Sequence, residues 1–270
     1  MALTLGSGPL SRRSTAETNY EIEGPEHLLL FEDYPRRMRA ILGGQTVADS
    51  ERCKLLWETG IPPVLYLPQE DLADGVADST SHATHCPFKG DASYWSLRAG
   101  DRVAENAVWG YPQPTERAPW LLGYVSIYWD AVDEWLQEDE PVVGHLRDPY
   151  HRVDVRQSTR RVVVRAAGEV VAETTRPKLL FETSLPTRYY IPREDVRTEL
   201  LEPSATVTHC PYKGDASYWS VAVGDQTLPD VAWAFREPLP ESEAVRDHVC
   251  FLGDGIEIDV EHAAAMPTAA

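Results

Sequence analysis

Short alternating runs of apolar and polar residues, separated by Gly, Pro and Asp, fill most of the chain and predict β-strands joined by turns. The segment 160–174 ("RRVVVRAAGEVVAET") predicts a hairpin that turns near Gly168, and 36–50 ("RRMRAILGGQTVADS") repeats it around a Gly-Gly pair. The segments 187–192 ("TRYYIP") and 230–235 ("DVAWAF") are further strand candidates. We therefore expect a mainly β fold with few short helices.

One segment has helical rather than alternating periodicity. In 130–139 ("DAVDEWLQED"), Val132, Trp135 and Leu136 share one helical face and Asp130 is placed to cap the N-terminus. We expect a helix there. The corresponding stretch of the second half, "DGIEIDVEH", alternates and predicts a strand.

The strongest pattern is an internal repeat. "THCPFKGDASYWS" at 84–96 recurs as "THCPYKGDASYWS" at 208–220, with 12 of 13 positions identical. The same shift of 124 residues places "KLLWETGIPPVLYLPQED" (54–71) over "KLLFETSLPTRYYIPRED" (178–195) without a gap. The chain is therefore a tandem duplication of a unit of about 100 residues.

The repeat divides the chain into five predicted parts, two of which are the copies themselves. "EHLLLFEDYPRR" is apolar enough to dock on a domain, and "QEDEPVVGHLRDPYHRVDVRQS" has the composition of a linker. The parts are an N-terminal arm (1–35), a first repeat domain (36–140), a linker (141–158), a second repeat domain (159–262) and a disordered tail (263–270).

Composition and charge narrow the function classes. A net charge of −18 argues against sequence-independent binding of nucleic acid and against anionic membranes. No secretory signal and no apolar run of membrane-spanning length occurs. Cys53, Cys86, Cys210 and Cys250 lie far apart, which disfavours a disulfide framework. We expect a cytoplasmic protein that binds an unidentified small molecule and is able to form a homo-oligomer.

The repeated stretch predicts a hairpin with reactive side chains on both faces. Pairing its arms across the turn "PYKGD" places Cys210 opposite Ala216, with neighbouring residues on alternate faces. On this register one face carries Val207, His209, Ser217 and Trp219, and the other carries Thr208, Cys210 and Tyr218. In the first copy His85, Ser93 and Trp95 oppose Thr84, Cys86 and Tyr94.

This sorting bears on catalysis and metal binding. A His–Cys dyad needs both groups within hydrogen-bond reach, whereas strand neighbours diverge, so a structural cysteine competes with a catalytic one. A zinc site in the second copy has four candidate ligands, but two of them are replaced in the first copy by Tyr124 and Ser126. We therefore expect no metal and no other cofactor. The four candidates are His209, Cys210, His248 and Cys250.

Two lysines and two glutamates complete the candidate site. Lys89 and Lys213 lie in the hairpin turns, where an amine is able to meet an anion. Glu58 and Glu182 end apolar strands, as exposed edge carboxylates or as buried groups that serve as acid, base or ligand anchor. The ligand-binding candidates are Lys213, Tyr218, Trp219, His209 and Glu182, with Lys89, Tyr94, Trp95, His85 and Glu58 in the first copy. The catalytic candidates are Cys210, Glu182, Cys86 and Glu58.

These motifs resemble a known family. "LLFETSLPTRYYIPREDV", "THCPYKGDASYWSV" and "VAWAFREPLPESEAVRDHV", with their first-copy counterparts, resemble the bacterial and fungal family catalogued as domain of unknown function 427. The trailing "RDPYHRVDV" of the first copy is similar to the actinobacterial tandem form. The resemblance covers roughly 220 of the 270 residues.

The resemblance implies a β-tent-like fold of coiled antiparallel sheets, akin to modules that bind small ligands. Those relatives hold zinc in paired C-x-x-C knuckles, which this sequence lacks. A nucleotidyltransferase-like label attached to the family implies an enzyme, although no paired carboxylates occur in a Gly-Ser context here. A small-molecule-binding module in each copy is the preferred interpretation. An enzyme, nucleotidyltransferase-like or dependent on a thiol or carboxylate, and a structural interaction module remain the alternatives.

Overall fold

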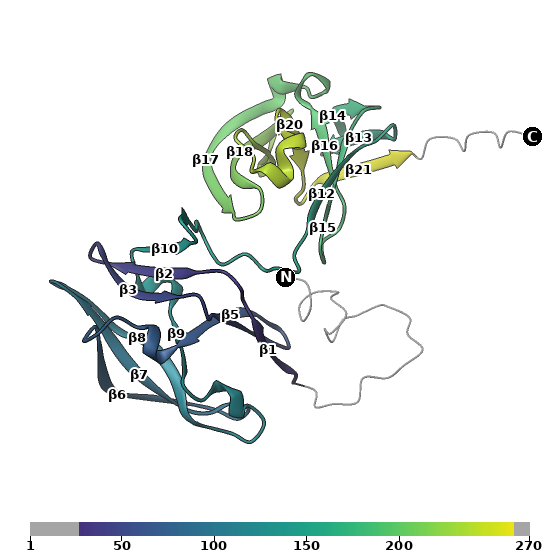
Figure 1. Cartoon of the computed structure of the whole chain (residues 1–270). Coiled ribbons are helices and arrows are strands. Elements are labelled where there is room, and N and C mark those ends of the chain that lie inside the picture. The colour runs from purple at the N-terminus through teal and green to yellow at the C-terminus, as the bar shows by residue number, and fades with distance from the viewer. Residues whose placement is uncertain (1–26, 262–270) are drawn as a thin grey trace, which may run out of the picture. The chain divides into compact units, whose positions relative to one another are not determined.

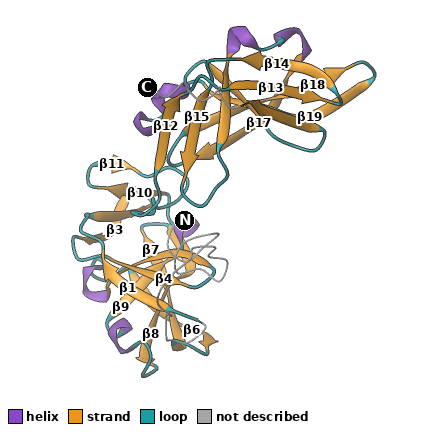
Figure 2. Ribbon diagram, turned by 90° about the vertical axis from the view of Figure 1, so that its right-hand side faces the viewer, coloured by secondary structure: helices purple, strands orange, loops and turns teal. Residues whose placement is uncertain are grey.

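The computed structural model describes residues 27–261, which form two units divided between Asp148 and Pro149 (Figure 1). Both units consist of antiparallel strands and short 3-10 helices (Figure 2), so the expected mainly β fold is confirmed. No helix of the described residues is long and apolar enough to cross a membrane. The predicted disordered tail and residues 1–26 of the predicted arm lie outside the described residues.

The first unit contains a seven-stranded sheet and a four-stranded sheet. The larger sheet has the order β1-β4-β5-β9-β8-β7-β6 and the smaller one β11-β10-β2-β3. The strands are β1 (Leu29–Asp33), β2 (Met38–Leu42), β3 (Gln45–Ser50), β4 (Lys54–Glu58), β5 (Ile61–Pro68), β6 (Ala77–Cys86), β7 (Gly90–Ala99), β8 (Arg102–Pro114), β9 (Tyr124–Ile127), β10 (Glu134–Gln137) and β11 (Glu140–Pro141). The 3-10 helices are η1 (Gln69–Asp71), η2 (Pro119–Leu121) and η3 (Trp129–Ala131).

The second unit repeats this plan with a three-stranded smaller sheet. Its larger sheet has the order β12-β15-β16-β20-β19-β18-β17 and its smaller sheet β14-β13-β21. The strands are β12 (Val153–Gln157), β13 (Arg161–Ala166), β14 (Glu169–Thr174), β15 (Lys178–Glu182), β16 (Arg188–Pro192), β17 (Leu201–Cys210), β18 (Gly214–Val223), β19 (Gln226–Phe235), β20 (His248–Phe251) and β21 (Ile256–Glu261). The 3-10 helices are η4 (Arg193–Asp195), η5 (Thr198–Leu200) and η6 (Pro240–Val245).

The two larger sheets have the same strand order, position by position. Each strand of the first sheet corresponds to the strand that the repeat in the sequence places over it, from β1 and β12 at one edge to β6 and β17 at the other. The duplication seen in the sequence is therefore also a duplication of the fold.

Both predicted hairpins form, as β2–β3 and β13–β14, and so do the strands predicted in β16, β19 and β21. The predicted helix over 130–139 is wrong. Only Trp129–Ala131 is helical, as a single 3-10 turn, and β10 follows it. The reason is that Trp135 pairs with Ala40 on β2 and stacks on Trp129 at 4.7 Å between ring centroids. Sheet pairing and aromatic packing override the local helical periodicity.

Strands β1 and β12 lie in the segments predicted as an arm and a linker. Each is an edge strand of its larger sheet and pairs antiparallel along five residues, β1 with β4 and β12 with β15. These flanking segments are thus structural parts of the two units, and they bring residues that precede each strand close to the sheet.

Apolar side chains cover both faces of each larger sheet. In the first unit Leu55 belongs to one buried cluster with Trp57, while the adjacent Leu56 belongs to another with Tyr66 and Tyr94. The second unit has a corresponding pair of clusters. Successive residues of one strand therefore enter different cores, as the alternation of a strand requires.

The repeated hairpin has a tighter turn than predicted. Cys210 pairs with Gly214 and His209 with Asp215, so the predicted register is wrong by two residues. The turn closes through the hydrogen bond from Lys213 N to Cys210 O at 3.1 Å. The second strand begins at Gly214, a position that requires glycine. Its φ is +94°, and the carbonyl oxygen of Glu237 would lie 3.0 Å from an added Cβ. A slip of two residues preserves the alternation, so the predicted sorting of side chains between faces holds.

Substitution of Gly214 by alanine should lower the free energy of unfolding more than substitution of Gly224. Both glycines have positive φ, a strain of about 1–2 kcal/mol for alanine, but only Gly214 faces backbone within contact distance. Overpacking there adds about 1–3 kcal/mol. Urea unfolding of the two variants checks this, and equal losses would contradict it.

Candidate functional site

A buried carboxylate in the second unit joins three segments of the chain. Glu182, at the end of β15, accepts a hydrogen bond from His151 Nε2 at 3.0 Å and forms an ion pair with Lys213 Nζ. His151 precedes β12 and Lys213 lies in the turn between β17 and β18. The segment before the edge strand, the end of the neighbouring strand and the hairpin turn thus meet in one contact group, which we call the charge link of this unit.

The first unit has the same charge link. Glu58, at the end of β4, accepts a hydrogen bond from His27 Nε2 at 3.2 Å and pairs with Lys89 Nζ. In both units the three residues follow one another at intervals of 31 residues along the chain. The geometry is thus a property of the repeated unit.

Neighbouring groups hold each charge link in place. The backbone N–H groups of Leu28 and Arg152 donate to the hydroxyls of Thr59 and Thr183, at 3.0 and 2.8 Å. These bonds fix the segment that carries the histidine against the end of the glutamate strand. The glutamate side chains are only 4% and 6% exposed in the first and second units, and the lysines 11% and 13%. Solvent therefore contributes little to balancing these charges.

An aromatic ring packs against the histidine of each charge link, and another ring lies near the lysine of the first unit. His27 stacks on Phe88 with centroids 3.9 Å apart, and His151 lies 4.1 Å from the ring of Tyr212. Lys89 Nζ lies 5.8 Å from the ring centroid of Tyr111. This distance is within the range of a cation–π contact.

The pKa of Glu182 is strongly lowered. Burial alone would raise it, but hydrogen bonds from His151 and Lys213, together with the charge of Lys213, outweigh burial and hold the pKa at about 2. Glu182 is therefore a carboxylate throughout the neutral range. It acts as an anchor for the ammonium rather than as a proton donor.

Tyrosine and cysteine lie on the same face as the charge link. Tyr94 OH shares a hydrogen bond with Thr84 at 2.9 Å, and Tyr218 OH with Thr208 at 3.1 Å. Cys86 and Cys210 are half-buried against the clusters that contain Tyr66 and Tyr190. Each hairpin thus supplies an amine and a phenol, and the carboxylate that binds the amine comes from β4 or β15.

The remaining predicted site residues lie on the opposite face or in the other core. His209 and His85 each contact a strand neighbour, Asp215 and Asp91, at 2.6 Å. Trp219 is buried in the cluster on the other side of the sheet, with Arg193 over its ring, and Trp95 packs against the corresponding cluster of the first unit. The hairpin therefore does not bring the tryptophans and these histidines together with the lysines and glutamates.

The four zinc-ligand candidates do not form a cluster. His209 pairs with Asp215 on an outer face, whereas Cys250 is buried in the core, where burial raises the pKa of its thiol to about 12. Over residues 27–261 no group of three or more His, Cys, Asp or Glu side chains is placed to hold a metal ion. All four cysteines are free thiols.

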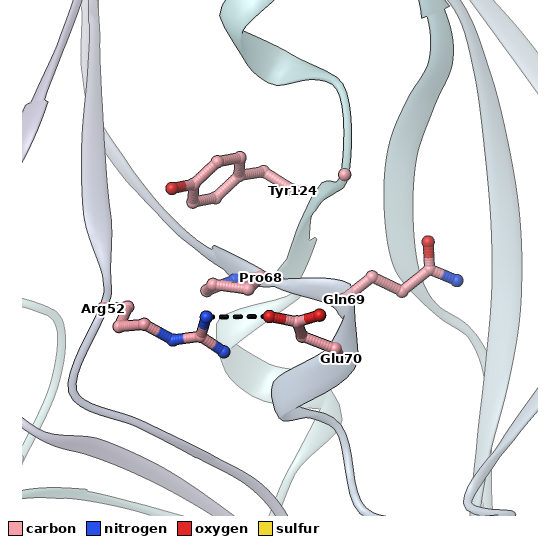
Figure 3. Close-up of a pocket in the computed structure, with 6 residues that line it drawn as sticks. Arg52, Pro68, Gln69, Glu70 and Tyr124 are labelled. Atoms are coloured by element: carbon pink, nitrogen blue, oxygen red, sulfur yellow. Dashed lines mark hydrogen bonds and ion pairs between the residues drawn. The ribbon is translucent and has the colours of Figure 1, made fainter.

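A cavity of about 560 Å³ lies elsewhere in the first unit (Figure 3). Its walls include Arg52, Gln69, Glu70 and Tyr124, and Arg52 pairs with Glu70 at 2.7 Å across it. None of the residues predicted for the site lines this cavity. The charged groups in its wall are already paired with each other.

Sequence reasoning missed two residues of the charge links, His27 and His151. Both lie in segments taken as an arm and a linker, outside the range over which the repeat was traced. The shift of 124 residues places one over the other, and extending the comparison upstream of residue 36 would have found them.

The lowered pKa of Glu182 predicts acid sensitivity of the second unit. The ionised carboxylate stabilises the folded state fully above its usual pKa of 4.5, and this stabilisation is lost as the pH falls toward 2. Between pH 6 and pH 3 the stabilising contribution should fall by about 2 kcal/mol, and Glu182→Gln should abolish this fall. Urea unfolding at both pH values measures it, with exposed Glu202→Gln as control. A pH dependence unchanged in Glu182→Gln would contradict the assignment.

Breaking a charge link should cost more than removing it. Lys213→Met leaves a buried carboxylate without its ammonium and should lower the free energy of unfolding by about 3–5 kcal/mol. Glu182→Leu combined with Lys213→Met should recover most of that loss. Unfolding experiments with Lys178→Met as control test this, and a double variant as unstable as Lys213→Met would refute it.

Comparison with known proteins agrees with this repeated architecture. A comparison with curated proteins found no match. The profile of the family described as domain of unknown function (DUF427) matches residues 30–138 and 154–263, one match in each unit. Because the two matches cover most of the 270 residues, the chain belongs to the DUF427 family and carries two copies of its domain.

Proposed function

We propose that each copy binds a small molecule beside the hairpin, at the lysine and tyrosine of the hairpin and the glutamate that pairs with the lysine. The proposal rests on the hydrogen-bond donors of the lysine ammonium that have no acceptor among the described residues. Among the described residues, Glu182 is the one hydrogen-bond acceptor of Lys213 Nζ, and Glu58 that of Lys89 Nζ. An ammonium has three N–H donors, so two remain for another acceptor.

Burial increases the free energy gained when these donors form a hydrogen bond. An amine with little solvent around it gains more from an added hydrogen bond than an exposed one does, because water competes less. The carboxylate of the charge link orients the amine. A ligand oxygen, either a carbonyl or a carboxylate, is the matching acceptor.

The tyrosine hydroxyl offers a second recognition group. Tyr94 and Tyr218 each share one hydrogen bond with an exposed threonine, Thr84 or Thr208, and a phenol is both donor and acceptor. Exposure of the threonine leaves this end of the site accessible. A polar group at the entrance and an amine inside suit a small ligand with more than one oxygen or nitrogen atom.

A structural interaction module is the second candidate. Each charge link joins the segment before an edge strand, the end of the neighbouring strand and the hairpin turn. Buried ion pairs of this kind are retained in some proteins to specify one conformation. On that interpretation the charge link needs no ligand.

Binding of two simple probes separates these functions. We expect benzamide, which has a carbonyl, and benzoate, which has a carboxylate, to bind the full chain saturably in calorimetric titrations. Glu58→Leu/Lys89→Met should remove the first site and Glu182→Leu/Lys213→Met the second, because the acceptor loses its ammonium.

The controls are Lys54→Met and Lys178→Met, which remove a lysine at the start of the same strand as the glutamate in each unit. Both should leave the titrations unchanged. If the two double variants remain folded and bind both probes as the natural chain does, the ligand-binding proposal fails and the structural function stands.

A further inference from the structure

We infer that the first copy has a platform of aromatic rings that accepts the planar ring of its ligand, and that the second copy lacks it. The platform consists of His82, Tyr94, Trp109 and Tyr128, which we call the ring row. The inference rests on the proposed function, because it assigns a ligand class to the face already proposed to bind.

The ring row crosses four neighbouring strands of the larger sheet. His82 lies on β6, Tyr94 on β7 and Trp109 on β8, and Tyr128 directly follows β9. Tyr94 pairs with Trp109 in the register of β7 and β8. The ring centroids of His82 and Tyr94, and those of Trp109 and Tyr128, are 4.4 Å apart. The row thus consists of two pairs of rings in contact, and the paired positions of Tyr94 and Trp109 place the two pairs on adjacent strands.

The outer rings of the row face solvent. Tyr128 is 47% exposed, His82 is exposed and Trp109 is half-buried, while Tyr94 is buried between them. An exposed cluster of large aromatic side chains on a soluble protein marks a binding surface more often than a scattered single residue does. Ring faces bind other planar rings by offset stacking and by edge contacts.

The second copy has the same scaffold without the row. Thr206 and Leu252 occupy the positions of His82 and Tyr128. Thr206 donates its hydroxyl to Asp230 instead of contacting a ring. Tyr218 and Trp233 remain, with their centroids 6.2 Å apart, so the second copy keeps the two central rings and lacks the two outer ones. The two copies thus share the amine and differ in the ring surface.

Tyr111 connects the ring row to the charge link. Its ring lies 5.8 Å from Lys89 Nζ, and it packs in one buried cluster with Tyr94. The second copy has Phe235 in this place. Tyr111 thus touches both the amine and the cluster that contains a ring of the row. The fitting ligand class is a planar aromatic ring that carries a carbonyl or a carboxylate.

Other ring-binding ligands fit less well. The row itself contains no carboxylate to attract an organic cation, and the net charge of −18 repels a nucleic acid strand that would stack its bases. A saturated ring of the same size buries a similar area but has no π face to stack.

The test compares benzamide with cyclohexanecarboxamide, which has the same carbonyl on a saturated ring. Calorimetric titration is performed on the full chain carrying Glu182→Leu/Lys213→Met, so that only the first site remains. We expect benzamide to bind at least five-fold more tightly. Replacing His82 by Thr and Tyr128 by Leu, the residues of the second copy, should abolish this preference, so that the two amides bind with similar affinity.

Each outcome is decisive for one claim. Equal affinity of the two amides, or a preference that survives His82→Thr/Tyr128→Leu, would overturn the ring platform while the proposed amine site stands. Failure of both amides to bind the first site would overturn the proposed function itself. The matched control is Thr206→His/Leu252→Tyr in a chain whose first site is removed by Glu58→Leu/Lys89→Met. This variant should gain a preference for benzamide, and its failure to do so would show that the four rings are not sufficient, contrary to the inference.

Discussion

The buried pairing of one glutamate with one lysine governs the local structure of each unit. A carboxylate this far from water is stable only when it is compensated, and Lys213 and His151 supply the compensation for Glu182. To reach it, the hairpin turn must lie over the end of β15 and the segment before β12 must follow the sheet edge. The charge thus fixes the relative positions of three segments that are distant in the sequence.

This constraint explains why the repeated stretch is nearly invariant between the copies. Lys213 is bound to Glu182, Gly214 has a left-handed backbone and a carbonyl oxygen against it, and His209 pairs with Asp215. Thr208 holds the hydroxyl of Tyr218. Each of these residues, which are the same in both copies, makes a defined contact. Packing alone tolerates exchange of similar volumes, as the change from buried Leu67 to buried Ile191 shows.

Much of the architecture could be predicted from the sequence because the signals are local or repeated. The hairpins around Gly43 and Gly168 follow from alternation and turn residues, and the duplication follows from the 124-residue shift. The helix over 130–139 was mispredicted because its local periodicity does not reveal that Trp135 pairs with Ala40 on β2. These two residues are about 95 positions apart in the sequence. The hairpin register failed because the sequence does not show the carbonyl that approaches Gly214. In the site, Glu182 and Lys213 were both predicted, although β15 does not neighbour β17 or β18 in the sheet. His151 was not predicted, since its segment has no strong strand pattern.

The histidines of the charge links lie outside the ranges that the family profile matches. The family match begins at residue 30 in the first unit and at residue 154 in the second, three residues after His27 and His151. A polypeptide trimmed to the matched ranges would keep nearly every strand of the sheet but would leave each buried carboxylate with one partner instead of two. The segment that the family profile recognises is therefore shorter than the segment that supplies every hydrogen-bond partner of its buried carboxylate.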